Sequence, residues 1–596
     1  MKRFIILFLI IFFCIGTYAE MTEVERKFHE EYGIVDMTPC ESEIGSLYTR
    51  SGFNCSYVSS RGKSYAPLFI PNEDDPIMNV RINLIFIQKD DGTGNFQKND
   101  IEHQTLFDDI ITQLNQTFST LVMPGTDCFN GTDDELVHDT RIRFVDHRYY
   151  IKDSRVWNNN LYNSGYNLCP APWYLDSFND SLTNATPDIS KAINVYFTED
   201  STVYHHFWEV QDLNDTSDVW IGNTTGACSQ FPSYSNLQQS SCVHIPCQYS
   251  KFWWMKHIVP QMWKFQYPSW EYQVRYWLVD GLARSLAHEL GHSFNLLHPH
   301  NEPVSETFYP FSSCGSSIMT QSGSSPRNFL PPEEIGRMYF HTMTTNLQQY
   351  IPSTTYLGAK TLNTTVSLPR MRMYYSLIIG PSGNVTIPCN ITFSTQGSII
   401  VENGGILSID GANLYGTDSK WGGIEVQSGG SLILSDVNIS NYNIVVKSGG
   451  SVVVRNNLTV VGDHYVKVED GGYLCIDNNA SIDLVDDLSY FILSPNVIFG
   501  CPSCSDDCLT SMSDVTYSGD GHIATYENTN FIQNTTISND NVVYGSDVYA
   551  GYDVTTTIPF GNVVIMPGGS LRVFSNSTIL TKDVEIKEGG ALLINK

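Results

Sequence analysis

The pattern of apolar positions divides the chain into two regions with different periods. Apolar and polar residues alternate along 79–88, and 192–198 is a second short apolar run, so both are expected to be β-strands. Between them, residues 101–121 repeat apolar side chains at helical spacing, at Leu106, Ile110, Leu114 and Phe118. The first region therefore opens with a strand followed by a helix.

Two more helices are expected further along this region. Asp280 is placed to cap a helix that begins at Gly281. A second helix begins at Pro331 and runs to about residue 350, with proline in its first turn and acidic residues at the positive end of its dipole. The first helix has an apolar stripe that predicts burial against a core, formed by Leu282, Ala283, Leu286, Leu290, Phe294 and Leu297.

From about residue 375 the chain consists of short β-branched runs separated by Gly-Gly pairs. Neighbouring pairs within two clusters are 20 to 25 residues apart, and they begin at Gly404, Gly429, Gly449, Gly471, Gly568 and Gly589. Such a period fits one coil of a parallel β-solenoid that stacks its apolar residues inside. Residues 353–596 are therefore expected to form an all-β domain, with a β-sandwich as the structural alternative.

The candidate chemistry lies in the sequence His-Glu-Leu-Gly-His-Ser-Phe-Asn-Leu-Leu-His, which begins at His288. His288 and His292 are four residues apart, so a helix projects both imidazoles from one face toward a tetrahedral Zn²⁺. Glu289 lies beside the first ligand and suits a general base. His298 is the candidate third ligand, which requires a turn after the helix, and Asn295 tolerates the positive φ of such a turn.

Other histidines offer weaker candidates. His300 is a competing third ligand, but its offset does not match the motif, so we interpret it as a loop residue. His205 and His206 have no partners at ligand spacing and are interpreted as surface or edge residues.

These residues resemble the metzincin metallopeptidases, whose extended motif has His, Glu, His, Gly and a third His, followed downstream by a Met-turn. Asn295 stands where the family has glycine, and Met319 matches the methionine that forms a hydrophobic floor beneath the zinc ligands without binding the metal. The layout is most similar to the pappalysin-like branch. The resemblance implies an α+β catalytic domain over residues 77–352 that holds one zinc ion.

The second region resembles the right-handed parallel β-helices of the pectate-lyase kind. Some of those proteins are polysaccharide lyases, but the coils carry no cluster of Asp, Arg and Lys that would support this activity. A spacer or a glycan-binding module is the simpler expectation.

The N-terminus predicts export. Met-Lys-Arg precedes an apolar run over residues 4–15, and the small-residue ending at Ala19 suits cleavage of a signal peptide, residues 1–19. A membrane anchor is the alternative, but about a dozen apolar residues are few for a bilayer span, and no second long apolar segment occurs. Residues 20–76 are polar and are expected to be a pro-segment or an N-terminal extension.

The cysteines agree with export. The signal peptide carries one of the fourteen, and thirteen in an exported chain predict disulfides, with at least one thiol left over. Cys501, Cys504 and Cys508 could bind a metal, but a loop disulfide is favoured. Cys40 or Cys55 capping the zinc of a latent precursor is a further hypothesis, which lacks a recognisable switch motif.

Glycosylation and charge limit the partners. The formal net charge of −29 argues against nucleic acid or an anionic membrane. Sequons predict a glycoprotein if the host glycosylates, and they lie at Asn54, Asn115, Asn130, Asn179, Asn184, Asn214, Asn223, Asn363, Asn384, Asn390, Asn438, Asn457, Asn479, Asn534 and Asn576.

The sequence thus predicts a secreted zinc metalloendopeptidase that hydrolyses peptide bonds of extracellular proteins. His288, His292 and His298 would hold Zn²⁺, and Glu289 would deprotonate the zinc-bound water and pass the proton to the leaving amine. Its partner would be a protein or peptide substrate. The alternative is an extracellular adhesin or glycan-binding protein whose β-helix binds glycans or a surface and whose zinc domain is vestigial.

Overall fold

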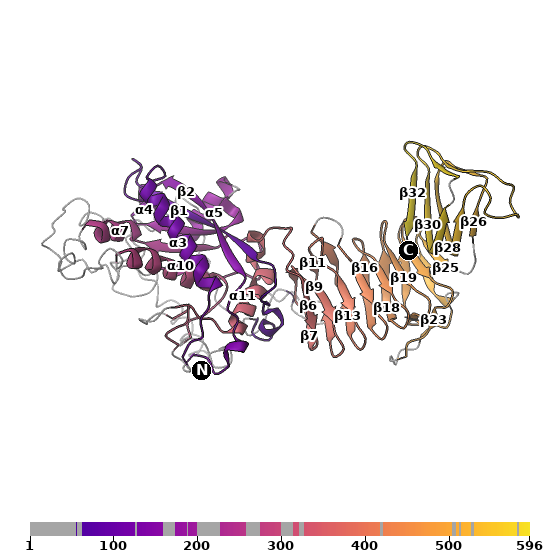
Figure 1. Cartoon of the computed structure of the whole chain (residues 1–596), viewed down its shortest axis with the longest axis horizontal. Coiled ribbons are helices and arrows are strands. Elements are labelled where there is room, and N and C mark those ends of the chain that lie inside the picture. Colours follow the sequence, from indigo (N-terminus) through magenta and orange to yellow (C-terminus); the bar gives the residue numbers. More distant parts are fainter. Residues whose placement is uncertain are drawn as a thin grey trace, which may run out of the picture.

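The computed structural model of the chain has two regions along one long axis, an N-terminal region of helices around a sheet and a C-terminal stack of strands (Figure 1). It describes residues 55, 62–125, 128–158, 173–186, 189–199, 227–229, 231–257, 274–299, 314–320, 327–417, 421–502, 508–511, 514–525, 530–580 and 583–595. The predicted signal peptide lies outside the described residues. In the described part of the chain, no helix is long and apolar enough to cross a membrane.

The N-terminal region is built on a five-stranded sheet in the order β2-β1-β3-β5-β4. Both strands predicted from the sequence are confirmed, and only the pairing of β4 with β5 is antiparallel among these strands. Helices separate the parallel strands along the chain, so the region is α/β and not the expected α+β. The strands are β1 (Met78–Gln88), β2 (Ile142–Lys152), β3 (Ile193–Thr198), β4 (Cys228–Ser229) and β5 (Cys242–Pro246).

The helices of this region are α3 (Ile101–Ser119), α4 (Ser154–Trp157), α5 (Trp173–Ala185), α7 (Gln248–His257), α10 (Gly281–Ser293) and α11 (Pro332–Thr344), with short 3-10 turns η2 (Ala66–Phe69), η3 (Asp133–Glu135) and η5 (Ile189–Lys191). The helix predicted over 101–121 is confirmed as α3, which Asp100 caps by accepting from two backbone N–H groups. The helix predicted from Pro331 ends earlier than expected. Thr345 is extended and caps a separate 3-10 turn, η9 (Asn346–Tyr350).

The predicted capping role of Asp280 is wrong. Asp280 has helical backbone angles, makes no side-chain cap, and ends a π-helical turn, η8 (Tyr276–Asp280). The chain therefore enters α10 already helical. The apolar stripe of α10 is buried as expected up to Phe294, but Leu297 is only half-buried and Leu296 is the buried residue, because the chain has left the helix by then.

The C-terminal region begins with three sheets that share coils of the chain, and all their strand pairings are parallel. Successive coils pair in register, so this is the stacked arrangement of a parallel β-helix, and the β-sandwich alternative is wrong. Its strands are β6 (Ala359–Leu362), β7 (Thr365–Ser367), β8 (Met371–Met373), β9 (Ser376–Ile379), β10 (Asn384–Ile387), β11 (Ile391–Phe393), β12 (Ile399–Val401), β13 (Ile406–Asp410), β14 (Leu414–Gly416), β15 (Ile424–Val426), β16 (Ser431–Ile439), β17 (Ile444–Val446), β18 (Ser451–Val460), β19 (Tyr465–Val468), β20 (Tyr473–Ile476), β21 (Ser481–Leu484), β22 (Tyr490–Leu493), β23 (Ile498–Phe499), β24 (Thr516–Ser518) and β25 (His522–Thr525).

The Gly-Gly pairs form one corner of these coils. The first glycine of each pair has a positive φ, for example 83° at Gly404 and 78° at Gly429. The N–H of Gly404 donates to the carbonyl of Gly429, and that of Gly429 donates to Gly449, both within 2.9 Å. The spacing of the pairs in the sequence is therefore the length of one coil.

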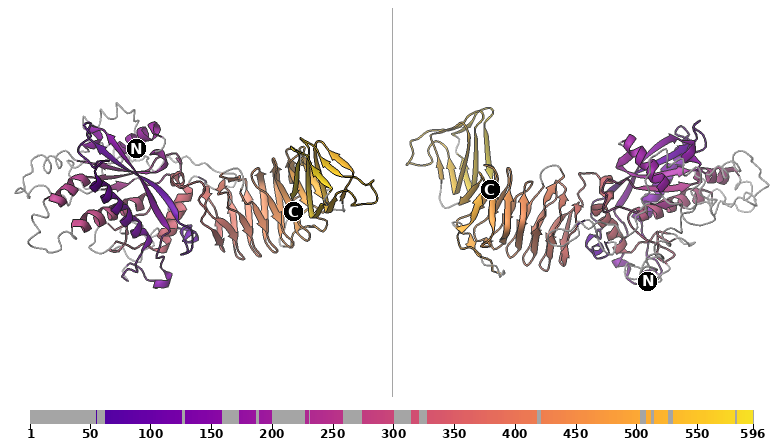
Figure 2. Two further views of the ribbon diagram at one scale, coloured as in Figure 1. Left: turned by 45° about the horizontal axis from the view of Figure 1, so that its top comes forward. Right: turned by 180° about the vertical axis from the view of Figure 1, so that it is seen from behind.

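A second, smaller stack follows and is set at an angle to the first in each view (Figure 2). It has its own apolar core, and Arg572 of this stack contacts Asp463 of the first. The single solenoid expected over residues 353–596 is thus divided into two. The strands of the second stack are β26 (Asn530–Ile532), β27 (Thr535–Ile537), β28 (Asp540–Ala550), β29 (Val563–Ile565), β30 (Ser570–Leu580), β31 (Val584–Ile586) and β32 (Ala591–Asn595).

Residues 62–76, here called the N-terminal strap, join the α/β region to the β-helix. Tyr65 stacks on Phe340 of α11, and its hydroxyl donates to the carbonyl of Ser367 at 2.8 Å. In a second contact, Lys360 of β6 donates to the carbonyl of Ile70 in the strap at 2.7 Å. This part of the segment expected to be a pro-segment or extension is built into the fold.

A disulfide and a shared core strengthen the same junction. Cys55 is bonded to Cys389 in the second coil of the β-helix. The buried aromatic rings Phe69 and Tyr375 stack across the junction, and one apolar cluster runs from the sheet of the α/β region into the coils. The two regions are therefore packed against each other.

The described sequons differ in exposure. Asn179 is fully buried and its amide is bonded within the fold, which leaves no room for a glycan. Asn115 is half-buried and exchanges two hydrogen bonds with the backbone of Phe144. Exposed sequon asparagines are Asn130, Asn184, Asn363, Asn384, Asn390, Asn438, Asn457, Asn479 and Asn534.

Candidate metal centre

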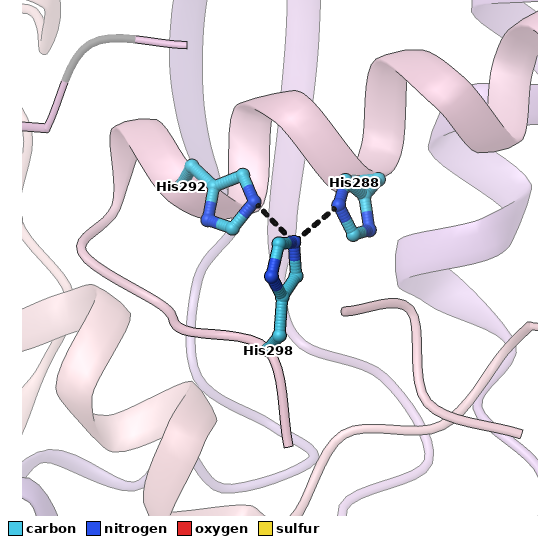
Figure 3. Close-up of side chains that lie close together, drawn as sticks. All are labelled: His288, His292 and His298. Atoms are coloured by element: carbon cyan, nitrogen blue, oxygen red, sulfur yellow. Dashed lines mark hydrogen bonds between the residues drawn. The ribbon is translucent and has the colours of Figure 1, made fainter. Parts of the chain in front are cut away.

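The structure brings the three predicted ligands together at one point (Figure 3). His288 and His292 project from the same face of α10, and the chain returns after the helix so that His298 faces both. The Nε2 atom of His298 is 3.0 Å from the Nε2 atoms of His288 and of His292. Ligand nitrogens around a tetrahedral zinc ion are about 3.3 Å apart, so the three imidazoles have nearly the spacing that zinc requires.

The two helical imidazoles are oriented by backbone carbonyl groups. His288 Nδ1 is 3.0 Å from the carbonyl oxygen of Ile318, and His292 Nδ1 is 2.8 Å from that of Leu296. A carbonyl only accepts, so each Nδ1 carries the proton and each Nε2 keeps its lone pair for a metal. Both rings are held in the ligating tautomer.

The turn between the helix and His298 follows the Schellman pattern. The N–H of Leu296 donates to the carbonyl of Gly291 at 3.0 Å, and that of Asn295 donates to His292 at 2.8 Å. Asn295 has a φ of 68°, the left-handed conformation that the spacing of the motif requires. The departure from glycine at this position therefore leaves the turn intact.

Met319 lies against the ligand helix. It is fully buried, and a Cβ atom on Gly291 would be 2.3 Å from its sulfur, so the absence of a side chain at Gly291 admits it. A disulfide between Cys128 and Cys314 anchors the segment that carries Met319 and the carbonyl of Ile318. Met319 is therefore packed against the ligand helix between His288 and His292.

Burial sets the charge states in the centre. Glu289 is 6% exposed, and this burial raises its pKa to about 8. Burial, and then the neighbouring His292, lower the pKa of His288 to about 3, so its imidazole is neutral at ordinary pH. A metal ion needs neutral imidazoles, and its positive charge would favour the ionised carboxylate.

The donor set fits zinc. Three imidazole nitrogens suit Zn²⁺ better than Ca²⁺ or Mg²⁺, which prefer oxygen. Within the described ranges no fourth His, Cys, Asp or Glu joins the group. His300, His205, His206 and Cys40 lie outside the described residues.

Capping of the zinc by Cys55 is wrong, because its sulfur is bonded to Cys389. The disulfide interpretation of the later cysteines is confirmed for Cys508, which pairs with Cys475, and for Cys501.

No sequence pattern predicts several of the residues that lie next to the three histidines. The ring of Phe231 packs edge-on against His292 with centroids 5.5 Å apart, and the hydroxyls of Ser229 and Ser293 are 2.8 Å apart. His341 of α11 contacts Asn295. These residues come from a loop, a two-residue strand and a distant helix, so only the fold brings them to the ligands.

Comparison with known proteins names no family for this chain. No protein-family model and no curated protein matches it. Among solved structures, the crystal structure of a TibC-catalysed hyper-glycosylated TibA fragment matches 41% of this chain and 96% of its own, with 17% identity and a TM-score of 0.16. This similarity is too low to carry an argument, so function has to be inferred from the site.

Proposed function

We propose that the protein is a secreted zinc-dependent endopeptidase of metzincin type that hydrolyses peptide bonds of extracellular proteins. The observation that carries this proposal is the convergence of three Nε2 atoms while the Nδ1 atoms of both helical ligands are held by carbonyls. Such a set favours a catalytic centre, because structural zinc sites use four protein ligands and catalytic sites use three.

Zinc bound by His288, His292 and His298 would polarise a substrate carbonyl and make a water molecule more acidic. Glu289, next to the first ligand on the same helix, is the general base. It takes the proton of the attacking water at its carboxylate and passes it to the leaving amine. Burial raises the pKa of Glu289, and the positive charge of a bound zinc ion would oppose this and favour the ionised carboxylate, the form that accepts a proton.

The disulfides support the proposed location. Cys55–Cys389, Cys128–Cys314 and Cys475–Cys508 indicate an oxidising compartment. Together with the predicted signal peptide, they favour a secreted enzyme.

The test is zinc content and cleavage of casein by the purified full-length protein, repeated with Glu289→Gln. We expect one zinc ion per chain in both proteins and a loss of cleavage of about a thousandfold or more in the variant. Unchanged cleavage by Glu289→Gln would contradict the assignment of Glu289 as the general base. Absence of zinc from the purified wild-type protein would contradict the whole proposal.

Binding of glycans or a surface by the β-helix is the second candidate, and its motivation is the long regular stack of coils with exposed polar corners. A glycan array probed with full-length Glu289→Gln protein separates the candidates. Specific binding joined to a wild-type protein that does not cleave casein would favour adhesion.

A further inference from the structure

A buried histidine outside the metal centre contacts the turn that precedes the third ligand. His341 of α11 has no exposed surface, and its Nε2 is 3.1 Å from the amide nitrogen of Asn295. An amide nitrogen only donates, so Nε2 accepts and Nδ1 carries the proton. Nδ1 is 2.7 Å from the hydroxyl of Tyr234, so the imidazole is fixed on both sides.

The contact with His341 helps to hold Asn295 in its left-handed backbone conformation. The left-handed conformation costs a non-glycine residue about 1 kcal/mol or more. The next residue, Leu296, presents the carbonyl that orients His292, and His298 follows two residues later. A change in conformation at Asn295 would therefore displace one ligand and release the orientation of another.

The contacts continue from Tyr234 to the β-helix. The carbonyl of Tyr234 accepts from Arg370 Nη2 at 2.8 Å, and Arg370 lies between β7 and β8 in the first coil. The neighbouring Ser233 donates its backbone N–H to the side-chain oxygen of Asn346, just after α11, and its carbonyl accepts from the backbone N–H of Asn346. The Tyr234 loop is thus held by the helix that carries His341 and by the first coil.

We propose that His341, held by Tyr234, is a positioning residue of the metal centre, and that Arg370 makes this positioning depend on the β-helix. The inference rests on the proposed function for the identity of the metal. It gives the β-helix a role in the centre besides that of a spacer or binding module. It also explains how asparagine serves at a turn position that favours glycine.

The experiment measures zinc dissociation constants of full-length variants by competition with a chromophoric chelator. Tyr234→Phe removes only the hydroxyl that His341 needs, and we expect zinc binding to weaken about tenfold. Arg370→Ala removes the contact from the β-helix, and we expect a loss of about threefold. Arg370 is half-buried and outside the α/β core, so this variant tests the coupling even if Tyr234→Phe folds poorly.

Matched controls exist for both variants. Tyr339→Phe, on α11, removes a buried hydroxyl that donates to the carbonyl of Thr140 and not to the turn. Arg372→Ala removes another link between the β-helix and the α/β region, to the carbonyls of Gln348 and Pro352. We expect both to bind zinc as the wild type does. Circular dichroism and thermal midpoints of the metal-free proteins report folding separately.

A double-mutant cycle distinguishes positioning from general damage. Glycine adopts the positive φ without a partner, so Tyr234→Phe in an Asn295→Gly background should leave zinc affinity within about twofold of Asn295→Gly alone. The positioning role would be overturned by an equal loss of zinc affinity in both backgrounds. It would also be overturned if Tyr234→Phe and Arg370→Ala both bound zinc with wild-type affinity. In either case, zinc binding by the wild-type protein would leave the proposed function standing. A wild-type protein without zinc would overturn both.

Discussion

Gly291 lies between the two helical ligands, where its hydrogen atom faces the sulfur of Met319. We expect Gly291→Ala to destabilise the protein by about 2 kcal/mol, because the added methyl group overlaps the sulfur in a closed core. Gly281→Ala is the control on the same helix, since nothing lies within 4 Å of its Cβ, and alanine there should be neutral or slightly stabilising. Urea unfolding compares the two, and equal effects would contradict this account of Met319.

Glu289 should give the metal-free protein a distinct dependence on pH. Its pKa of about 8 in the folded state lies above the ordinary value of 4.5. Between pH 4.5 and pH 8, the folded chain therefore keeps a proton on Glu289 that the unfolded chain has lost. The stability from this group is present below pH 4.5 and is lost as pH rises to 8. Glu289→Gln lacks this loss, so after chelation its advantage over wild type should grow to about 4 kcal/mol at pH 8. A difference that urea unfolding finds constant from pH 5 to 8 would contradict the buried carboxyl.

The sequence was sufficient to identify the three histidines that converge but not the residues that support them. Spacing within one helix and one turn is local, so His288, His292 and His298 could be read from the chain. Tyr234 and His341 are separated by 107 residues and meet only when the α/β region has folded. Contacts of this kind have no periodic signature.

At the scale of elements, the corner glycines of the coils explain the period of the second region. Gly404→Ala should destabilise the β-helix by about 3 kcal/mol, because a Cβ there would be 2.7 Å from the carbonyl oxygen of Pro381 and the positive φ adds strain. Gly411 has a positive φ but open space around it, so Gly411→Ala should cost only about 1 kcal/mol. Denaturant unfolding of both variants measures the difference, and equal costs would contradict the steric part of this explanation.

Local patterns predicted elements well where one period dominates. The strands β1 and β3, the helix α3 and the coils follow from alternation, helical spacing and glycine pairs. The capping of α10 by Asp280 failed because the preceding residues continue the helix as a π-helical turn. The division of the solenoid into two stacks was also not predicted, because the glycine pairs of both stacks have the same spacing.

At the scale of the whole molecule, the strap, the disulfide and the shared core make the two regions one packed unit. Replacing Cys55 and Cys389 by serine should lower the free energy of unfolding by about 3 kcal/mol, because the bond closes a loop of 334 residues. The loss should affect zinc retention and β-sheet unfolding together. Loss of the bond between Cys475 and Cys508, which spans 33 residues within the coils, should leave zinc retention unchanged. Calorimetry with a parallel measurement of zinc release tests both variants. Unchanged zinc retention after loss of the Cys55–Cys389 disulfide would contradict the packed junction.

The bond from Cys55 to Cys389 also determines what a nick in the chain would do. If a host enzyme cuts anywhere between these two cysteines, the fragments stay covalently joined. Such material would migrate as a single band on a denaturing gel until a thiol reagent is added, and would then separate into pieces. Maturation of this protein should therefore be followed on paired gels, with and without reductant.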